Sequence, residues 1–421
     1  MNANPPGGVP GTSAPTSGKV VIVSPGGAGT PPSPTCGIQE AVNSLRAGGG
    51  TVRVSAGTYA LTDVVHLASG VSLVFDNATL RCPAGKQAIN GTNVTDVSLA
   101  GSGSFISSAP GQVGMVFTAC QRVVFDGAFS FSGWSGAQNV PAVISQGNRD
   151  CRFAGWRTGD SSLFLSLGDT NLEVCRMSGS LAPGSVPISK PFVNVMTNAD
   201  HPNMTGIRVH DLAFDGGGVI DVSFVRVRLD QAAGRSGTNV ELRSIHCRNG
   251  NPVSIWCDTL DSYGIVGCKI SDIQSDGIYT GLSIANSQCE VNDCVAVNCY
   301  SQGLVVGGAG QLGDIANVVV TNFQARRCCR GTDLGYRISN GQILADGTHG
   351  RIDNLLVRNC IADARGSEHG FHGFSINGVQ MGSITLDGGH FIGAGAGQHL
   401  FVAPSVRPGA VRQMTPPTLG S

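Results

Sequence analysis

Residues 38–82 read IQEAVNSLRAGGGTVRVSAGTYALTDVVHLASGVSLVFDNATLRC, and the pattern of this stretch decides the fold. Ile38, Val42 and Leu45 recur at helical spacing, and the run of glycines that follows is a common end for a helix. The next residues change abruptly to the alternation of apolar and polar side chains that is typical of strands. The sequence therefore predicts one short amphipathic helix over residues 36–47, followed at once by short β-strands.

The rest of the chain repeats the strand pattern at irregular intervals. Strand-like segments begin at Ile207, Val240, Tyr263, Cys289, Val318, Leu355 and Met381. The intervals between successive starts are 33, 23, 26, 29, 37 and 26 residues. A period of this size, without helical segments between the strands, is typical of solenoid coils rather than of propeller blades or helical repeats. We therefore expect an all-β chain that folds as a parallel β-helix.

The composition fits an all-β chain and excludes two classes of partner. Of the 421 residues 41% are apolar, 13% are charged and 61 are glycine, so turns are frequent and solvated helix faces are rare. The formal net charge of -1 gives no basic surface for phosphates, so we expect no nucleic-acid partner. No apolar stretch reaches the roughly 18 residues that a membrane span needs, so we expect no membrane span.

The 14 cysteines are spread along a long chain, unlike those of small disulfide-rich domains, so we expect mostly reduced thiols. Cys268, Cys294 and Cys360 occupy similar strand positions, where a buried thiol packs as a small apolar group. No pair of cysteines has the Cys-x-x-Cys spacing of a zinc site, and no aspartate cluster has the spacing of a calcium loop. The sequence predicts no metal site and no cofactor.

The two ends of the chain differ from its middle. Residues 1–34 are rich in Pro, Gly, Ser and Thr and predict a flexible or extended arm. A strand-like run from Lys19 to Val23 inside this arm could cover the first coil or pair with a partner chain. The arm begins without the charged and apolar segments of a signal peptide, so we expect no encoded export signal. The solenoid is expected over residues 35–405, with 406–421 as a C-terminal tail.

The stretch at residues 38–82 resembles the N-terminal cap and first coils of the pectate-lyase-like superfamily. Members carry a helix that plugs the open end of a right-handed parallel β-helix, followed by a Gly-Gly-x-Val-x-Val-x-x-Gly-x-Tyr strand and turn, which Gly49 to Tyr59 match. A weaker resemblance extends over residues 36–405. It implies an all-β, right-handed parallel β-helix with a short N-terminal capping α-helix.

The superfamily implies three alternative functions, because its members include pectin and alginate enzymes and phage tailspikes that bind or cut surface polysaccharide. The expected lack of an export signal favours a virion-associated, tailspike-like protein, found on the phage particle. It would form a homotrimer and attach to other virion proteins through the arm. A non-catalytic virion component, such as a fibre or capsid decoration, is the second alternative. A free polysaccharide lyase or glycoside hydrolase, with an extracellular location, is the third.

Six residues are candidates for a sugar site. Glycosidases use paired carboxyl groups, and Asp276, Glu368 and His369 are the candidate catalytic residues. Each also suits a solvated turn between strands, which is the alternative interpretation. Gln302, His372 and Trp256 are candidate carbohydrate-binding residues, because aromatic and amide side chains contact sugars through apolar faces and hydrogen bonds.

The spacing of these candidates tests whether they can form a pair. Asp276, Gln302 and Glu368 each follow a strand cysteine by eight residues. If the register is unshifted, Asp276 and Gln302 lie one coil apart, and Glu368 lies about two coils further on. The resulting separation of about 15 Å between the two carboxyl groups exceeds the roughly 5 to 10 Å of glycosidase pairs. Whether the chain is an enzyme therefore stays open at this point.

Overall fold

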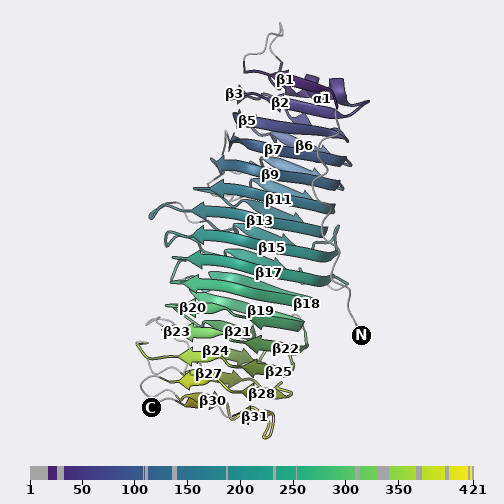
Figure 1. Cartoon of the computed structure of the whole chain (residues 1–421). Coiled ribbons are helices and arrows are strands. Elements are labelled where there is room, and N and C mark those ends of the chain that lie inside the picture. The colour runs from purple at the N-terminus through teal and green to yellow at the C-terminus, as the bar shows by residue number, and fades with distance from the viewer. Residues whose placement is uncertain are drawn as a thin grey trace.

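The protein is a single rod of stacked β-coils, described from a computed structural model (Figure 1). The structure describes residues 18–25, 33–107, 109, 112–134, 140–185, 188–230, 234–252, 254–308, 313–329, 341–366, 372–393, 398–415 and 418–419. Within these ranges the chain forms one helix, α1 (Ile38–Leu45), and 32 strands. Every strand pairing is parallel, and each coil pairs only with the coils before and after it, as in a solenoid.

Each coil contributes a short strand to one face of the rod, which we call the short-strand face. Its strands are β4 (Val65–His66), β6 (Ile89–Thr92), β8 (Met115–Thr118), β10 (Val143–Gln146), β12 (Phe164–Leu167), β14 (Val193–Met196), β16 (Val225–Arg228), the first part of β18 (Asp258–Asp276), the first part of β19 (Thr280–Asn292), β21 (Leu304–Gly307), β24 (Gly341–Asp346), β27 (His372–Asn377) and β30 (Leu400–Val402).

Longer strands make the other two faces. They are β5 (Val71–Arg81), β7 (Thr95–Ile106), β9 (Gln121–Ser132), β11 (Arg149–Thr158), β13 (Thr170–Ser180), β15 (Asn203–Asp215), β17 (Ser236–Arg248) and the remainder of β18. The first part of each long strand lies on a second face and its last part on a third, and in most of these strands a residue of positive φ, such as Asp211 at 57°, lies at the bend.

Towards the C-terminal end of the rod the same bend separates two strands. The second face continues through the last part of β19 and through β22 (Ile315–Thr321), β25 (Ile352–Arg358), β28 (Ile384–Asp387) and β31 (Val411–Thr415). The third face continues through β20 (Val295–Val297), β23 (Gln324–Arg326), β26 (Ile361–Asp363), β29 (His390–Ile392) and β32 (Thr418–Leu419). At the N-terminal end, β2 (Gly50–Val54) and β3 (Gly57–Ala60) both pair with β5.

The helix caps the first coil, as the sequence predicted. Ile38, Val42 and Leu45 are buried, because the apolar stripe of α1 covers the open end of the core. β1 (Val20–Val23) pairs in parallel with β2, so this run covers the first coil of its own chain. At the other end, the pairings of β31 and β32 carry the sheet past residue 405.

The predicted repeat is correct at some coils and wrong at others. Ile207 pairs with Val240, and Val318 pairs with both Cys289 and Leu355. The predicted starts at Tyr263 and Met381 are wrong, because the residues in register are Cys268 and Ile384. Coils differ in length at their loops, so counting along the sequence shifts the register where a loop is short or long.

The core is a continuous column of apolar side chains inside the coils. The 14 cysteines, all within the described ranges, are thiols, and 13 of them are buried. Cys268, Cys294 and Cys360 are fully buried, as expected, but they do not stack in one column. In the next coil, the strand partner of Cys268 is Cys289. Gln274 pairs with Val295, so the residue that stacks on Cys294 is Ile273 and not Cys268. Among the described residues no helix is long and apolar enough to cross a membrane.

One carboxyl group is buried inside the rod, in the turn after β12. Asn148 N–H donates to Asp169 Oδ1 at 2.6 Å, and Ser166 Oγ donates to Asp169 Oδ2 at 2.7 Å. Burial nevertheless raises the pKa of Asp169 to about 6. Since that pKa lies above the unfolded value of about 3.9, ionised Asp169 destabilises the folded state above pH 6, and this penalty disappears as the pH falls towards 4.

Asp169→Asn is therefore expected to stabilise the protein relative to wild type at pH 8 by up to roughly 3 kcal/mol, and not at pH 4. Thermal melting of both proteins at the two pH values measures the effect. Asp76→Asn, at a surface ion pair with Arg53, is the control and is expected to change Tm much less at pH 8. A difference in Tm between variant and wild type that is the same at pH 4 and pH 8 would contradict the raised pKa of Asp169.

Candidate functional site

Charged side chains gather on the short-strand face near the middle of the rod. In β16, Val225 and Val227 point into the core, so Arg226 and Arg228 point outward. The next coil pairs Asp261 with Arg226 and Tyr263 with Arg228. The coil after that pairs Ser283 with Asp261. Strand pairing thus stacks these outward side chains coil on coil.

Asp261 is the centre of this cluster. Arg226 Nε donates to Asp261 Oδ2 at 2.7 Å, and Arg228 Nη1 lies 3.9 Å from the same oxygen. The Asp261 side chain is only 6% exposed. Burial raises its pKa, and the charges of Arg226 and Arg228 oppose that rise. Its carboxylate is therefore buried but held beside two cations.

Asp258 begins the same strand, three residues before Asp261, and the two carboxyl groups interact electrostatically. Burial raises the pKa of Asp258 well above its usual value, and the charge of Asp261 raises it further. Hydrogen bonds from Ser283 and Thr280 oppose this rise without cancelling it. Burial therefore favours the protonated form more strongly at Asp258 than at Asp261, whose pKa rise the two arginines oppose. This is the arrangement by which acid and base roles are divided between paired carboxyls.

Several polar atoms of the cluster are buried without a hydrogen-bond partner in the described part of the chain. They are Asp261 Oδ1, Arg228 Nε and, in the adjoining strand residue Thr259, Oγ1. Buried polar atoms are nearly always satisfied in folded proteins, so three together indicate groups left for a ligand or for water. We call Arg226, Arg228, Asp258, Asp261 and Tyr263 the carboxylate–arginine cluster.

An exposed aromatic residue flanks this cluster. Trp256 is 63% exposed and precedes Asp258 by two residues. Ser223 Oγ lies 3.4 Å from both the Trp256 carbonyl oxygen and Asp261 Oδ2, which ties the Trp256 segment to the cluster. Trp134 and Trp156 are buried in the core, so Trp256 is the tryptophan available to a ligand.

Two other predicted binding residues follow the cluster along the same face. Asp258 pairs with Thr280, and Gly281 N–H donates to the Gln302 carbonyl at 3.0 Å in the next coil. His372 begins β27 two coils beyond Gln302, because β21 pairs with β24 and β24 with β27. Gln302 and His372 are both buried, and the His372 ring stacks on Phe401 at 4.3 Å. Their side chains are packed where the sequence analysis expected contacts with sugar.

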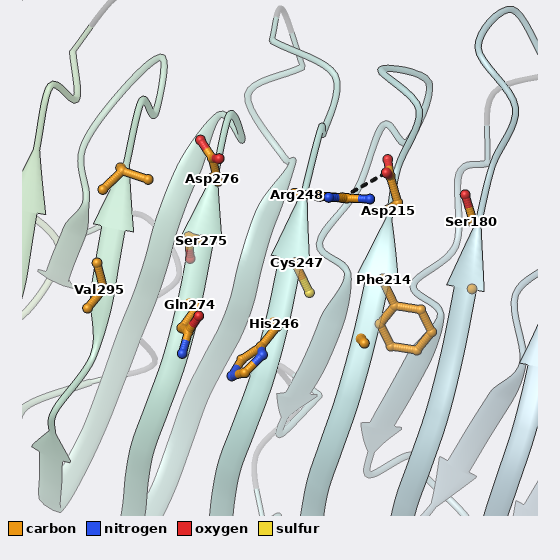
Figure 2. Close-up of a pocket in the computed structure, with 13 residues that line it drawn as sticks. Ser180, Phe214, Asp215, His246, Cys247, Arg248, Gln274, Ser275, Asp276 and Val295 are labelled. Atoms are coloured by element: carbon orange, nitrogen blue, oxygen red, sulfur yellow. Dashed lines mark hydrogen bonds and ion pairs between the residues drawn. The ribbon is translucent and has the colours of Figure 1, made fainter.

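Asp276 lies elsewhere, in a groove on the third face (Figure 2). The groove encloses about 520 Å³ and is lined by the ends of β13, β15, β17, β18 and β20. Strand pairing stacks Asp215, Arg248 and Asp276 on successive coils, so Asp215 and Asp276 are two coils, or about 10 Å, apart.

Each carboxylate of this groove already has a partner. Arg248 Nε donates to Asp215 Oδ2 at 2.9 Å, and Asn298 Nδ2 donates to Asp276 Oδ1 at 2.8 Å. Burial raises the pKa of Asp215, but hydrogen bonds from Gly217 N–H, Asn249 and Arg248 outweigh it, so its pKa lies below the usual value. His246 and Gln274 also line the groove (Figure 2). This surface suits polar contacts better than proton transfer.

The strand register shows that Asp276 and Gln302 are not neighbours, although their equal spacing from Cys268 and Cys294 predicted that they are. Asp276 pairs with Val297, and the residue level with Gln302 is Thr280, so Asp276 and Gln302 lie on different faces. The expectation failed because Cys268 and Cys294 belong to different columns of the core. Glu368 and His369 lie outside the described residues.

The residues of the carboxylate–arginine cluster were not predicted from the sequence. A signal was present in Val225-Arg-Val-Arg228, where two arginines alternate with core residues in a short strand, and again in Leu260-Asp-Ser-Tyr263. The alternation of apolar and charged residues predicts that the charged side chains point outward. Only the strand pairing shows that residues 225–228 and 260–263 are neighbours. Burial of the carboxyl groups, which sets their pKa, is not visible in the sequence.

Comparison with known proteins gives fold relatives of low sequence identity. No protein-family model matches the chain, and no curated protein matches it. Tailspike protein 3 of bacteriophage CBA120 aligns over 89% of this chain and 58% of its own, with a TM-score of 0.54 and 13% identity. The Streptococcus pneumoniae surface adhesin PfbA aligns over 91% of this chain and 95% of its own, with a TM-score of 0.48 and 12% identity.

A family 28 exopolygalacturonase of Yersinia enterocolitica aligns over 83% of this chain and 80% of its own, with a TM-score of 0.48 and 12% identity. At such identities the likeness concerns the fold, and it agrees with the parallel coils and the capping helix described above. The chain therefore folds as an all-β, right-handed parallel β-helix with a short N-terminal capping helix.

Proposed function

We propose that the protein binds an acidic bacterial surface polysaccharide along the short-strand face and hydrolyses it at the carboxylate–arginine cluster. The observation that carries the proposal is the pair of buried carboxyl groups at Asp258 and Asp261, with the first kept protonated and the second held beside arginines. Glycoside hydrolysis needs one carboxyl group to donate a proton and another to act as base or nucleophile.

The roles follow from the surroundings of each group. Asp258 donates its proton to the leaving glycosidic oxygen, and Asp261 acts as the base or nucleophile. Arg226 and Arg228 favour a sugar that carries a carboxylate, since guanidinium groups pair well with planar anions. The unpartnered Arg228 Nε and Asp261 Oδ1 are donors and acceptors for that sugar.

A panel of acidic and neutral bacterial polysaccharides tests the proposal. Hydrolysis releases reducing ends without new absorbance, whereas a lyase also produces the absorbance of an unsaturated uronate. We expect reducing ends alone, on an acidic polysaccharide. Silence on every polysaccharide, with copurification in intact phage particles, would favour a non-catalytic virion component such as a fibre or capsid decoration.

Trp256 is the proposed stacking platform for a sugar ring. Trp256→Ala is expected to weaken polysaccharide binding roughly 10-fold, because an exposed aromatic face contributes about 1.4 kcal/mol when a sugar covers it. Calorimetric titration with an oligosaccharide measures the loss. Ile255→Ala is the matched control, since Ile255 is the neighbouring exposed side chain. Equal affinity of Trp256→Ala and wild type would remove Trp256 from the site.

We also propose that the protein is a tailspike-like component of a phage particle, that it assembles as a homotrimer, and that residues 1–34 attach it to other virion proteins. The likeness in fold to a phage tailspike supports this, and an extracellular enzyme is the alternative. Light scattering on the purified full chain measures the mass of the assembly. Deletion of residues 1–17, ahead of β1, is expected to leave that mass unchanged and to abolish incorporation into particles.

A further inference from the structure

A second cluster of chemically active side chains lies on the second face, away from the proposed sugar site. In β13, Leu172 and Val174 point into the core, so Glu173 and Cys175 point outward. Strand pairing sets Cys175 directly beside His210 of β15. The ligand atoms of Glu173, Cys175 and His210 all lie within 4.8 Å of one another.

We propose that Glu173, Cys175 and His210 form a binding site for a zinc-like divalent cation. A carboxylate oxygen, an imidazole nitrogen and a thiolate sulfur are the donor types that zinc takes, and three protein ligands leave a fourth position for water. This site is independent of the proposed polysaccharide function.

The carboxylate and imidazole ligands need little adjustment to receive the ion. His210 Nε2 lies 2.9 Å from Glu173 Oε1. Two ligands about 2.0 to 2.1 Å from a tetrahedral ion are roughly 3.3 Å apart, so the ion fits when this pair opens by about 0.4 Å. The Glu173 and His210 side chains retain 10% and 11% exposure, which leaves the site open to ions from solvent.

The surrounding residues orient two of the ligands. His210 Nδ1 lies 2.8 Å from Asp211 Oδ2, and this contact orients the imidazole ring so that Nε2 faces Glu173. Arg152 Nη1 donates to Glu173 Oε2 at 2.7 Å, which leaves Oε1 for the ion. Asp126 accepts a 3.0 Å hydrogen bond from Arg152 Nε and also pairs with Arg176, so its carboxylate offsets part of the positive charge beside the site.

Binding exchanges a proton for the metal. Burial raises the pKa of Cys175, so the empty site holds a thiol. When the ion binds, the S–H bond breaks, a sulfur–metal bond forms and the proton passes to solvent. The ion also takes the place of the contact between His210 Nε2 and Glu173 Oε1, so any proton on Nε2 leaves that nitrogen before it binds the ion. The two anionic ligands then balance the charge of the divalent ion.

Cobalt(II) titration of the metal-free, full-length protein tests the proposal, because cobalt reports thiolate ligation by a near-ultraviolet charge-transfer band. We expect one cobalt per chain with that band, release of at least one proton per ion, and displacement of cobalt by zinc. Cys175→Ser is expected to remove the band, and Asp211→Asn to weaken affinity roughly 10- to 100-fold as an orienting residue.

Cys36→Ser and His246→Gln are matched controls, since Cys36 precedes α1 and His246 lies on the third face, and both variants should keep the band and the affinity. The wild-type titration does not depend on any variant folding. Wild-type protein that shows no thiolate band at a cobalt concentration 100-fold above that of protein would overturn the proposal. A band that persists in folded Cys175→Ser would do the same.

Discussion

Asp258→Asn is expected to lower kcat for polysaccharide cleavage at least about 100-fold, because a positioned general acid contributes roughly 10²- to 10⁴-fold. Asparagine keeps the size of the side chain but carries no proton for the leaving oxygen. In wild type, Asp258 is protonated well above the usual carboxyl range, since burial and the charge of Asp261 raise its pKa. Initial rates of reducing-end release on the active polysaccharide measure the loss.

The pH profile separates lost chemistry from lost structure. Wild-type activity should fall as the pH rises through the raised pKa of Asp258, because the ionised group cannot donate a proton. The residual activity of Asp258→Asn should not show this decrease with rising pH. Asp276→Asn is the matched control, since Asp276 lies on the third face and hydrogen-bonds to Asn298. Near-normal activity of Asp258→Asn with strong loss in Asp276→Asn would move the active site to the third-face groove.

Phe125→Ala is expected to destabilise the protein by roughly 3 to 5 kcal/mol, the usual cost of removing a fully buried aromatic ring. Phe125 is at the centre of the aromatic part of the core, with ring centroids 4.9 Å from Phe129 and 4.7 Å from Trp156. The cavity cannot collapse easily, because the neighbouring strands are fixed by pairing on both sides. The shift of the thermal or denaturant unfolding transition measures the effect.

Phe125→Leu is the matched control, because it keeps most of the apolar volume and should cost clearly less than the alanine variant. Each coil packs only on its neighbours, so the loss should concentrate around β7, β9 and β11 rather than spread along the rod. Hydrogen exchange followed along the chain reports that distribution. Equal destabilisation by leucine and alanine would show that ring shape rather than volume matters at this position.

The fold could be predicted from local patterns because a solenoid is built from local repeats. The helix at Ile38–Leu45 and the alternation that follows it are both present in a single stretch, and the structure confirms both. The number of residues per coil could not be predicted, since successive register partners from Val240 to Cys268 to Cys289 are 28 and 21 residues apart. Loops of unequal length therefore shifted the expected neighbours of Asp276.

The candidate site depended on facts that no local pattern contains. Trp256 was a candidate from its residue type, and it lies beside the carboxylate–arginine cluster, but Asp258 and Asp261 were not singled out. Their importance comes from burial and from the arginines one coil earlier, both of which require the register. The metal-ligand cluster has the same origin, because Glu173 and His210 are 37 residues apart in sequence and meet only through the pairing of β13 with β15.

The most direct test is a crystal structure of the Asp258→Asn variant with an oligosaccharide of the polysaccharide that wild type cleaves. We expect the sugar along the short-strand face, with one ring against Trp256, a sugar carboxylate at Arg226 or Arg228, and a glycosidic oxygen within hydrogen-bond distance of residue 258. An oligosaccharide bound instead in the third-face groove, beside Asp215 and Asp276, would contradict the account.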